Sequence, residues 1–448
     1  MTLEPTNTTL VSTSYQKRGE LMALHFRLPY GGGQYQEVSI EETQFAGLLK
    51  HTQAGQPLNQ AELRYALEKP TGSSPLTSLV KKGDRVAVIT SDISRPCPSK
   101  ILVPLVLEQL HKAGVRKEDV FIVLALGNHR AHTEAERQSL LGIDTCTGYR
   151  CLDSNPNDVV HLGTTTRGTP VAIFRPVVEA DKRVLLGNVE YHYFAGYSGG
   201  LKALMPGCAT HSSIQANHSM MVDERAIAGE ITNNPVRQDI EEVARFVPAD
   251  FIFNMVLDEQ KNVLGAFAGH PISAHREAAR YLDTIYKVKL DEPADIVIAS
   301  AGGFPKDINL YQAQKAIDNA SRAVRPGGIL ILVAECPEGL GDEVFARWIA
   351  AARKPEDLID RIRVQFELGG HKAAAIAMVR QKIDIYLVSS MPEEIVRRAF
   401  LEPFDSINAA YRQALKAVGP GAKVMVMPQA GSVLPVVESP SWACELRY

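Results

Sequence analysis

Several features that would place this 448-residue chain in a specialised class are missing from its sequence. The six cysteines are widely scattered and form no C-x-x-C pair, which argues against a zinc ribbon or a thioredoxin-like motif and favours a reduced, cytoplasmic protein. No stretch approaches 18 consecutive apolar residues, so no membrane span is expected, and the polar N-terminal segment is unlike a signal peptide. The formal net charge of -3, with no long run of one sign, argues against general nucleic-acid binding.

What remains is the composition of an ordinary globular protein. Hydrophobic residues make up 45% of the chain and charged residues 22%. The length is too great for one core and predicts two or three domains. No internal repeat and no low-complexity tract is present.

Apolar runs alternate with helical patterns along the first half of the chain. Short strands are expected at 21–27 and 35–40, as a hairpin around three glycines. Buried strands are expected at 85–90 and 120–126, with a helix over 99–114 between them. A further helix is expected after Thr133, which has Glu136 at capping-box spacing. These βαβ units predict a parallel sheet.

The second half repeats this pattern, with strands expected at 294–300, 329–335, 383–389 and 423–427 and a helix at 308–324. The predicted fold is α/β, with two domains whose largely parallel sheets are flanked by helices and an active site in the cleft between them. The expected boundaries are 1–289 plus about 425–448 for a cofactor-binding domain, and 290–424 for a C-terminal domain.

Polar loops follow three of the expected strands. Ligands of open α/β sheets bind beyond the carboxyl ends of the strands, so these loops are candidates for a site. They carry Asp92 and Arg95, then His129, and finally Tyr311, Gln312 and Lys315.

The most informative segment is 190–218. It combines His192, the Ser198-Gly199-Gly200 turn, Lys202 and His218. Backbone N–H groups of such a turn can bind an anion, and the histidines are candidate bases or metal ligands. His211 and His218 lie seven residues apart, which is poor spacing for joint chelation.

Each of these residues also has a simpler explanation. Arg95 could lie on the surface or pair with Asp92, and His129 could hydrogen-bond a neighbouring turn. The Gly-Gly pair could be a plain turn, Lys202 could be solvated, and His218 could be a satisfied buried histidine. Taken one at a time, these residues do not decide between a functional and a plain structural role.

In combination, the motifs resemble the nickel-pincer nucleotide-dependent lactate racemase family. The resemblance extends over about 85–320. It rests on Asp92-Ile-Ser-Arg95-Pro, Gly127-Asn-His129-Arg, His192-Tyr-Phe-Ala-Gly-Tyr-Ser-Gly-Gly-Leu-Lys202, Pro206-Gly207, Asn217-His218 and Asn309-Leu-Tyr-Gln312-Ala-Gln-Lys315.

The resemblance implies a cofactor and a role for each matching residue. The cofactor is a pyridinium-3-thioamide-5-thiocarboxylate mononucleotide that holds nickel and is linked covalently to Lys202, with His218 completing the nickel coordination. His129 and His192 match the paired acid/base histidines, and Arg95 and Lys315 match cationic residues of the active site. The remaining matches are to residues of the cofactor site. The resemblance implies that the turn of Ser198, Gly199 and Gly200 holds the cofactor phosphate with backbone N–H groups and that Asp92 orders the loop around Arg95. Tyr311 and Gln312 match polar residues that line the same cleft.

The implied reaction inverts the hydroxyl-bearing α-carbon of a 2-hydroxy acid. In the family mechanism a histidine takes the hydroxyl proton while the α-hydrogen leaves as hydride to the cofactor, and the planar 2-oxo acid then receives the hydride on its other face. Lactate, longer or aryl hydroxy acids, malate and sugar acids all stay open as substrates. Enzymes that make the cofactor are the expected upstream partners, and the oligomeric state stays open.

Two other classes compete with this interpretation. A nicotinamide-dependent oxidoreductase predicts a G-x-G-x-x-G turn after a strand, and none occurs in that context. A non-catalytic protein that binds nickel or the nucleotide would need Lys202 and His218 but not both His129 and His192. The presence of both histidines favours catalysis.

Overall fold

The structure is a computed structural model that describes residues 12–14, 23–52 and 55–437. The chain divides into two compact units. The central unit, named for its place in the sequence, is Gln53–Ile285, and the terminal unit combines Met1–Thr52 with Tyr286–Tyr448. Each unit is built on a six-stranded sheet of its own.

The sheet of the central unit has the strand order β14-β13-β10-β5-β6-β7. Neighbouring strands run parallel, except that β13 and β14 are antiparallel. Its middle strands are almost continuously buried, as expected for a parallel sheet covered on both faces. The strands are β5 (Val86–Ser91), β6 (Val120–Ala125), β7 (Arg150–Asp153), β10 (Lys182–Asn188), β13 (Phe251–Leu257) and β14 (Val263–Gly269).

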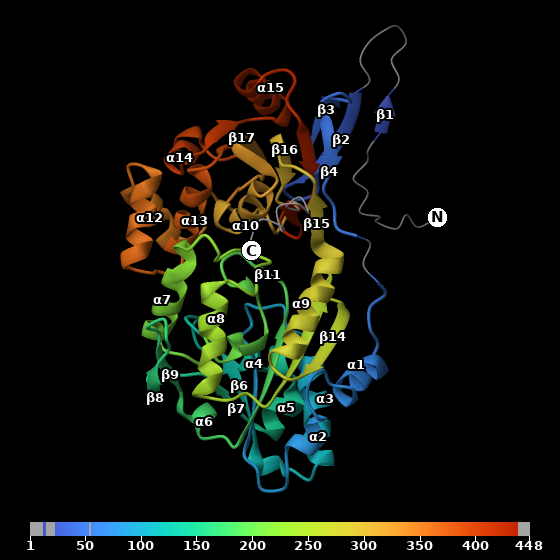
Figure 1. The fold of residues 1–448 in the computed structure, drawn as a ribbon, viewed down its shortest axis with the longest axis vertical. Helices are drawn as coiled ribbons and strands as arrows, with labels where there is room; N and C mark the ends of the chain where they lie inside the picture. Colours follow the sequence, from blue (N-terminus) through green and yellow to red (C-terminus); the bar gives the residue numbers. More distant parts are fainter. Residues whose placement is uncertain (1–11, 15–22, 53–54, 438–448) are drawn as a thin grey trace, which may run out of the picture. The chain divides into compact units, whose positions relative to one another are not determined.

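Helices and two small hairpins complete the central unit. The helix after Thr133 begins with the expected capping box, because Thr133 accepts from Glu136 N–H and Glu136 accepts from Thr133 N–H. Helices α7 and α8 pack side by side (Figure 1). The helices are α1 (Gln60–Glu68), α2 (Leu76–Leu79), α3 (Ser99–Lys112), α4 (Glu134–Leu141), α5 (Ile143–Gly148), α6 (Arg175–Val178), α7 (His211–Ser219), α8 (Pro235–Glu242) and α9 (Ser273–Tyr286). The hairpins are β8 (Val159–Thr164) with β9 (Pro170–Phe174), and β11 (Tyr191–His192) with β12 (Gly196–Tyr197).

The sheet of the terminal unit is parallel and has the order β19-β18-β17-β16-β20-β4. Its strands are β4 (Phe45–Leu48), β16 (Ala294–Ser300), β17 (Val324–Val333), β18 (Asp384–Val388), β19 (Glu402–Phe404) and β20 (Val424–Met427). The antiparallel strands β2 (Ala23–Tyr30) and β3 (Gln34–Glu41) form the expected hairpin, with β1 (Ser12–Ser14) beside β2. β15 (Lys287–Leu290) pairs with β21 (Leu434–Val437). The helices are α10 (Leu310–Ser321), α11 (Glu343–Ala351), α12 (Pro355–Val364), α13 (Gly370–Arg380), α14 (Glu393–Arg398) and α15 (Ile407–Val418).

The predicted fold class, two α/β domains with largely parallel sheets, is confirmed. The compact units nevertheless divide the chain differently from the expected boundaries. Residues 23–52 belong to the terminal unit, because β4 pairs with β20 at the edge of its sheet. The segment 425–437 also stays there, since β20 lies between β16 and β4 and β21 pairs with β15. Residues 438–448 lie outside the described part of the chain.

Each sheet has its own hydrophobic core. One cluster packs β5, β6 and β10 against α3, and the other packs β16, β17 and β20 against α15 and the β2–β3 hairpin. Within the described ranges, no helix is long and apolar enough to cross a membrane.

Candidate active site

The loop after β5 carries a buried carboxylate. Asp92 accepts a hydrogen bond from Nδ1 of His129 at 2.8 Å and another from the Ser94 hydroxyl at 3.1 Å. Burial by itself would raise the pKa of Asp92, but the hydrogen bonds from His129 and Ser94 and the charge of Arg95 bring the pKa below its ordinary value. Asp92 is therefore ionised at neutral pH.

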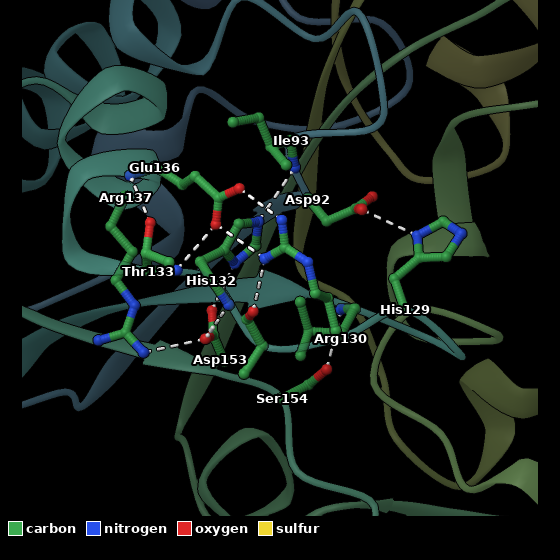
Figure 2. Close-up of polar contacts among 12 residues, drawn as sticks. Asp92, Ile93, His129, Arg130, His132, Thr133, Glu136, Arg137, Asp153 and Ser154 are labelled. Atoms are coloured by element: carbon green, nitrogen blue, oxygen red, sulfur yellow. Dashed lines mark hydrogen bonds and ion pairs between the residues drawn. The ribbon is translucent and has the colours of Figure 1, made fainter.

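The loop after β6 brings His129 to that carboxylate. β5 and β6 are neighbouring parallel strands, so their carboxyl ends lie at the same edge of the sheet. Because an ionised carboxylate can only accept, the proton of neutral His129 is on Nδ1, and Nε2 carries the lone pair. Nε2 of His129 is thus the ring nitrogen that can accept a proton, and Figure 2 shows the contact of Nδ1 with Asp92.

The β11–β12 hairpin, which carries His192, is fixed by polar contacts from two helices. On α8, the fully buried Arg237 donates to the carbonyls of Ala195 and Tyr197. On α9, Asp283 accepts from the hydroxyls of Tyr191 and Tyr197, each at 2.8 Å. A short hairpin has little stability of its own, so these helices determine where His192 lies.

His192 has the opposite tautomer to His129. Its Nδ1 accepts the backbone N–H of Ala195 at 3.3 Å, so the ring proton is on Nε2. Burial lowers the pKa of His192 well below its ordinary value, and the positive charge of Arg95 lowers it further. His192 is therefore neutral at physiological pH.

Gly199 and Gly200 are needed for steric reasons. Both have positive φ, at 75° and 59°. A Cβ on Gly200 would lie 2.9 Å from the ring of His275, and one on Gly199 would lie 2.8 Å from Oδ1 of Asn254. The turn leads directly into the short 3₁₀ helix η2 (Gly200–Ala203) that carries Lys202.

The polar groups of this turn are largely paired within the protein. The Gly200 N–H donates to Asn254 at 2.7 Å, and the Ser198 N–H donates to the carbonyl of Glu190 at 2.8 Å. The Ser198 hydroxyl also bridges the Asn188 carbonyl and the Glu190 N–H. The backbone N–H groups of Ser198 and Gly200 thus already donate to acceptors within the protein, and not to a bound anion.

Lys202 has an environment that favours the neutral amine. Burial lowers its pKa well below the ordinary value, and the charges of Arg237 and Arg95 act in the same direction. A neutral amine carries a lone pair and can act as a nucleophile, whereas an ammonium cannot.

The ring of Phe194 lies among three of the predicted site residues. Its centroid is 4.5 Å from that of His192 and 4.9 Å from that of His218, both edge-on. Nζ of Lys202 lies 6.0 Å from the same centroid. One buried aromatic ring therefore brings the candidate base, metal ligand and cofactor lysine together.

His218, in the last turn of α7, is oriented by a chain of buried polar groups. Its Nδ1 donates to Oδ1 of Asn217 at 3.1 Å, and Nδ2 of Asn217 donates to Asp239 at 2.7 Å. The ring proton is thereby held on Nδ1 and the lone pair on Nε2, the arrangement typical of metal-binding histidines. Among the described residues no group of three or more His, Cys, Asp or Glu side chains could hold a metal ion. His211, at the other end of α7, is exposed and contacts Asn128.

The third set of predicted residues belongs to the terminal unit. Asn309 caps α10, which presents Tyr311, Gln312 and Lys315 within its first two turns. Lys372 donates to the Tyr311 carbonyl at 2.7 Å and lies 4.0 Å from the centroid of its ring. Tyr311 is thereby fixed from a second helix, α13.

Several residues that position the site were missed by sequence reasoning. Arg237, Asn254, His275 and Asp283 are distant in sequence from the residues that they hold, and no motif marks them. His275, for example, donates to the Ser198 carbonyl at 2.7 Å from α9. Asn217, by contrast, belongs to the Asn217-His218 motif that the sequence shows.

The chain is similar in sequence to proteins of known family. Residues 30–229 match the family model of the lactate racemase N-terminal domain, and residues 289–435 match that of the C-terminal domain. The chain is 32% identical over 423 residues to the lactate racemase of Thermoanaerobacterium thermosaccharolyticum, covering 92% of this chain and 99% of that protein. It is 29% identical over 408 residues to the lactate racemase of Lactiplantibacillus plantarum, covering 88% and 96%.

Solved structures give the same result. The lactate racemase apoprotein from Thermoanaerobacterium thermosaccharolyticum superposes with a TM-score of 0.84 at 31% identity, covering 93% of this chain and 100% of that one. A protein from Thermotoga maritima, at 19% identity and a TM-score of 0.62, covers 86% and 100% and shares the fold.

The two α/β units and the sequence matches are those of a racemase. The chain belongs to the lactate racemase family. It is accordingly an isomerase.

Proposed function

We propose that this protein racemises a 2-hydroxy acid, lactate in the first instance, with a nickel-pincer nucleotide tethered to Lys202. The observation that carries the proposal is the grouping of His192, His218 and Lys202 around Phe194, in a chain whose relatives are named lactate racemases.

The residues present fit the proposed cofactor. Lys202 has the lowered pKa that a nucleophilic amine needs, and the ring of His218 is oriented by the hydrogen bond of its Nδ1 to Asn217. Nδ2 of Asn254, beside Gly199, is a buried donor with no hydrogen-bond partner in the described part of the chain. When bound, the cofactor supplies the acceptor and donor of the α-hydrogen as hydride.

His129 is proposed as the base that takes the hydroxyl proton of one enantiomer. Its Nε2 accepts the proton, and the resulting imidazolium is stabilised by Asp92, whose carboxylate is 2.8 Å from Nδ1. The same carboxylate fixes the orientation of the ring, as the acidic member of a hydrolase triad does.

His192 is proposed as the base for the opposite enantiomer. In the geometry described, its Nε2–H is a donor that can hydrogen-bond an oxygen of the substrate. To accept a proton at Nε2, the ring must move its own proton to Nδ1 and release the Ala195 N–H. That contact is long, at 3.3 Å, so its loss costs only about 1 kcal/mol.

The remaining residues are proposed to bind and orient. Arg95 is close enough to Asp92, His192 and Lys202 to affect the pKa of each, and its guanidinium suits the substrate carboxylate. Lys315, Gln312 and Tyr311 are proposed to contribute from α10. Gly199 and Gly200 shape the turn before Lys202, and Ser198 holds that turn to residues 188 and 190.

The test is to express the protein together with the cofactor-synthesis enzymes and to determine its intact mass, its modified peptide and its nickel content. The proposal expects an adduct on Lys202 and stoichiometric nickel. An unmodified lysine and no nickel, under conditions that load a known lactate racemase, would remove the proposed cofactor. A loaded protein that never racemises a hydroxy acid would instead favour the alternative, a non-catalytic nickel or nucleotide-cofactor binding protein.

A further inference from the structure

A second histidine in the loop after β6, His132, bonds to the largely buried carboxylate of Asp153 and to the loop that carries Asp92. Its Nδ1 lies 2.7 Å from Oδ1 of Asp153, and its Nε2 accepts the backbone N–H of Ile93 at 3.1 Å. The side chain of His132 is only 1% exposed. Figure 2 shows the chain of contacts from Arg137 through Asp153 and His132 to Ile93.

These two contacts fix the state of the His132 ring. Because Ile93 donates to Nε2, that nitrogen carries the lone pair and the proton is on Nδ1, where Asp153 accepts it. Asp153 has two further donors, the His132 backbone N–H at 3.0 Å and Arg137 at 2.9 Å. Burial would raise the pKa of Asp153, but the bonds from His132 and Arg137 bring it below the ordinary value.

The contacts of His132 with Asp153 and Ile93 lie at the carboxyl edge of the central unit's sheet. β5, β6 and β7 are three successive strands of the sheet. The loop after β5 carries Asp92 and Ile93, and the loop after β6 carries His129 and His132. β7 ends at Asp153. The pair therefore ties together three loops at one sheet edge.

Residues 93–95 of the loop that carries Asp92 have little apolar anchorage. The side chain of Ile93 is 43% exposed, and Ser94 and Arg95 are also exposed. Apolar burial thus contributes little to the conformation of 93–95, and polar bonds must hold it. The bond from Ile93 N–H to His132 acts one residue away from the carboxylate that orients His129.

We propose that His132 and Asp153 form a positioning pair that holds Asp92 against His129 and thereby keeps the proton of His129 on Nδ1. His132 acts through Asp92 and needs no contact with substrate. The consequence for catalysis rests on the proposed function, whereas the consequence for the tautomer of His129 does not.

The competing explanation is a purely structural role, in which His132 only donates a hydrogen bond to the largely buried carboxylate of Asp153. Two substitutions separate these roles. His132→Asn keeps a donor near the position of Nδ1 for Asp153 but has no acceptor for Ile93. His132→Gln can place its carbonyl oxygen near the position of Nε2 and so keeps an acceptor for Ile93. If His132 positions Asp92, the glutamine variant keeps more of the Nδ1–H form of His129 and more of kcat than the asparagine variant. If His132 has only a structural role, the asparagine variant keeps more of both.

The first measurement uses the unloaded protein with its histidine side chains labelled with ¹⁵N, well above the ordinary histidine pKa of about 6.5. Long-range ¹H–¹⁵N correlations report the tautomer of each ring, and His129→Gln assigns the signal of His129. We expect the Nδ1–H form in the parent and in His132→Gln, and a mixture of tautomers in His132→Asn. His161→Asn, an exposed substitution on β8, is the control that leaves the signal unchanged.

The second measurement uses the loaded protein and lactate. We expect His132→Asn to lower kcat by about 10- to 100-fold, a typical effect of a supporting residue, with little change in KM and with adduct and nickel content unchanged. His132→Gln is expected to recover most of that loss. Asp153→Asn, which keeps an acceptor for Nδ1–H, serves as a further variant if His132→Asn does not fold.

An unchanged His129 tautomer and unchanged kcat in a folded His132→Asn would overturn the proposal, as would a larger defect in His132→Gln than in His132→Asn. A loaded parent without racemase activity would instead refute the proposed function, and the tautomer measurement on the unloaded protein would still decide the role of His132.

Discussion

His129 and His192 hold their protons on opposite ring nitrogens. Nδ1 of His129 donates to Asp92 at 2.8 Å, whereas Nδ1 of His192 accepts from Ala195 at 3.3 Å. Towards a substrate, one ring offers a lone pair and the other offers an N–H. The two bases of the proposed reaction are thus chemically inequivalent before substrate binds, because a carboxylate supports only one of them.

Removing the charge of Asp92 tests this asymmetry. We expect Asp92→Asn to lower kcat by about 100-fold or more, because an amide neither stabilises the imidazolium of His129 nor enforces its tautomer. The matched control is Asp119→Asn, which removes an ion pair with Arg116 just before β6. A kcat in Asp92→Asn as high as in the control would contradict the proposed role.

The same substitution makes a prediction about stability and pH. The folded-state pKa of Asp92 is below its unfolded value of about 3.9, so its contribution to stability is present above that pH and is lost as the pH falls through the folded-state value. Urea unfolding of parent and Asp92→Asn from acid to neutral pH should therefore show a difference that shrinks towards acid. A difference that stays constant over this range would show that Asp92 is not held as the ionised form.

Nickel binding should depend on one end of α7. His218→Ala is expected to lose nickel while the adduct on Lys202 persists, since Nε2 of His218 is the proposed metal ligand. His211→Ala, an exposed histidine at the other end of the same helix, should retain nickel. Metal analysis and intact mass of both variants measure nickel content and the adduct on Lys202. Retention of nickel by His218→Ala would disprove that His218 is the nickel ligand.

The Gly-Gly turn should be sensitive to a single methyl group. Gly200→Ala forces a residue with Cβ into φ of 59° and brings Cβ to 2.9 Å from the His275 ring, so we expect a loss of about 2 kcal/mol or more in unfolding free energy and poor loading of Lys202. Gly168→Ala also has positive φ but meets no atom within 4 Å, so it pairs the same backbone strain with no steric clash. Equal stability and loading in the two variants would show that contact with His275 is unimportant.

The sequence predicts the strands and the loops of the site well for physical reasons. Buried parallel strands such as β5 and β6 are plain apolar runs, and Thr133 with Glu136 is a local capping signal. Polar residues after such strands must lie at the carboxyl edge of the sheet, which is how Asp92 and His129 could be placed near each other.

Contacts between distant segments could not be predicted in this way. The pairing of β4 with β20 joins residues nearly the whole chain apart, and it moves the N-terminal hairpin into the terminal unit. Arg237 looks like an ordinary charged helix residue, yet it is fully buried against the hairpin that carries His192. The roles of Lys202 and His218 came from the resemblance, because spacing alone left simpler explanations open.

Racemisation by two acid/base histidines is tested by incubating the loaded protein with pure L-lactate and following the appearance of D-lactate by chiral separation. His129→Gln and His192→Gln variants of equal nickel and adduct content are measured beside it. We expect conversion to an equal mixture by the parent and a loss of turnover of about 100-fold or more in each variant. Full racemase activity in either loaded histidine variant would contradict the proposal that His129 and His192 both act as acid/base residues.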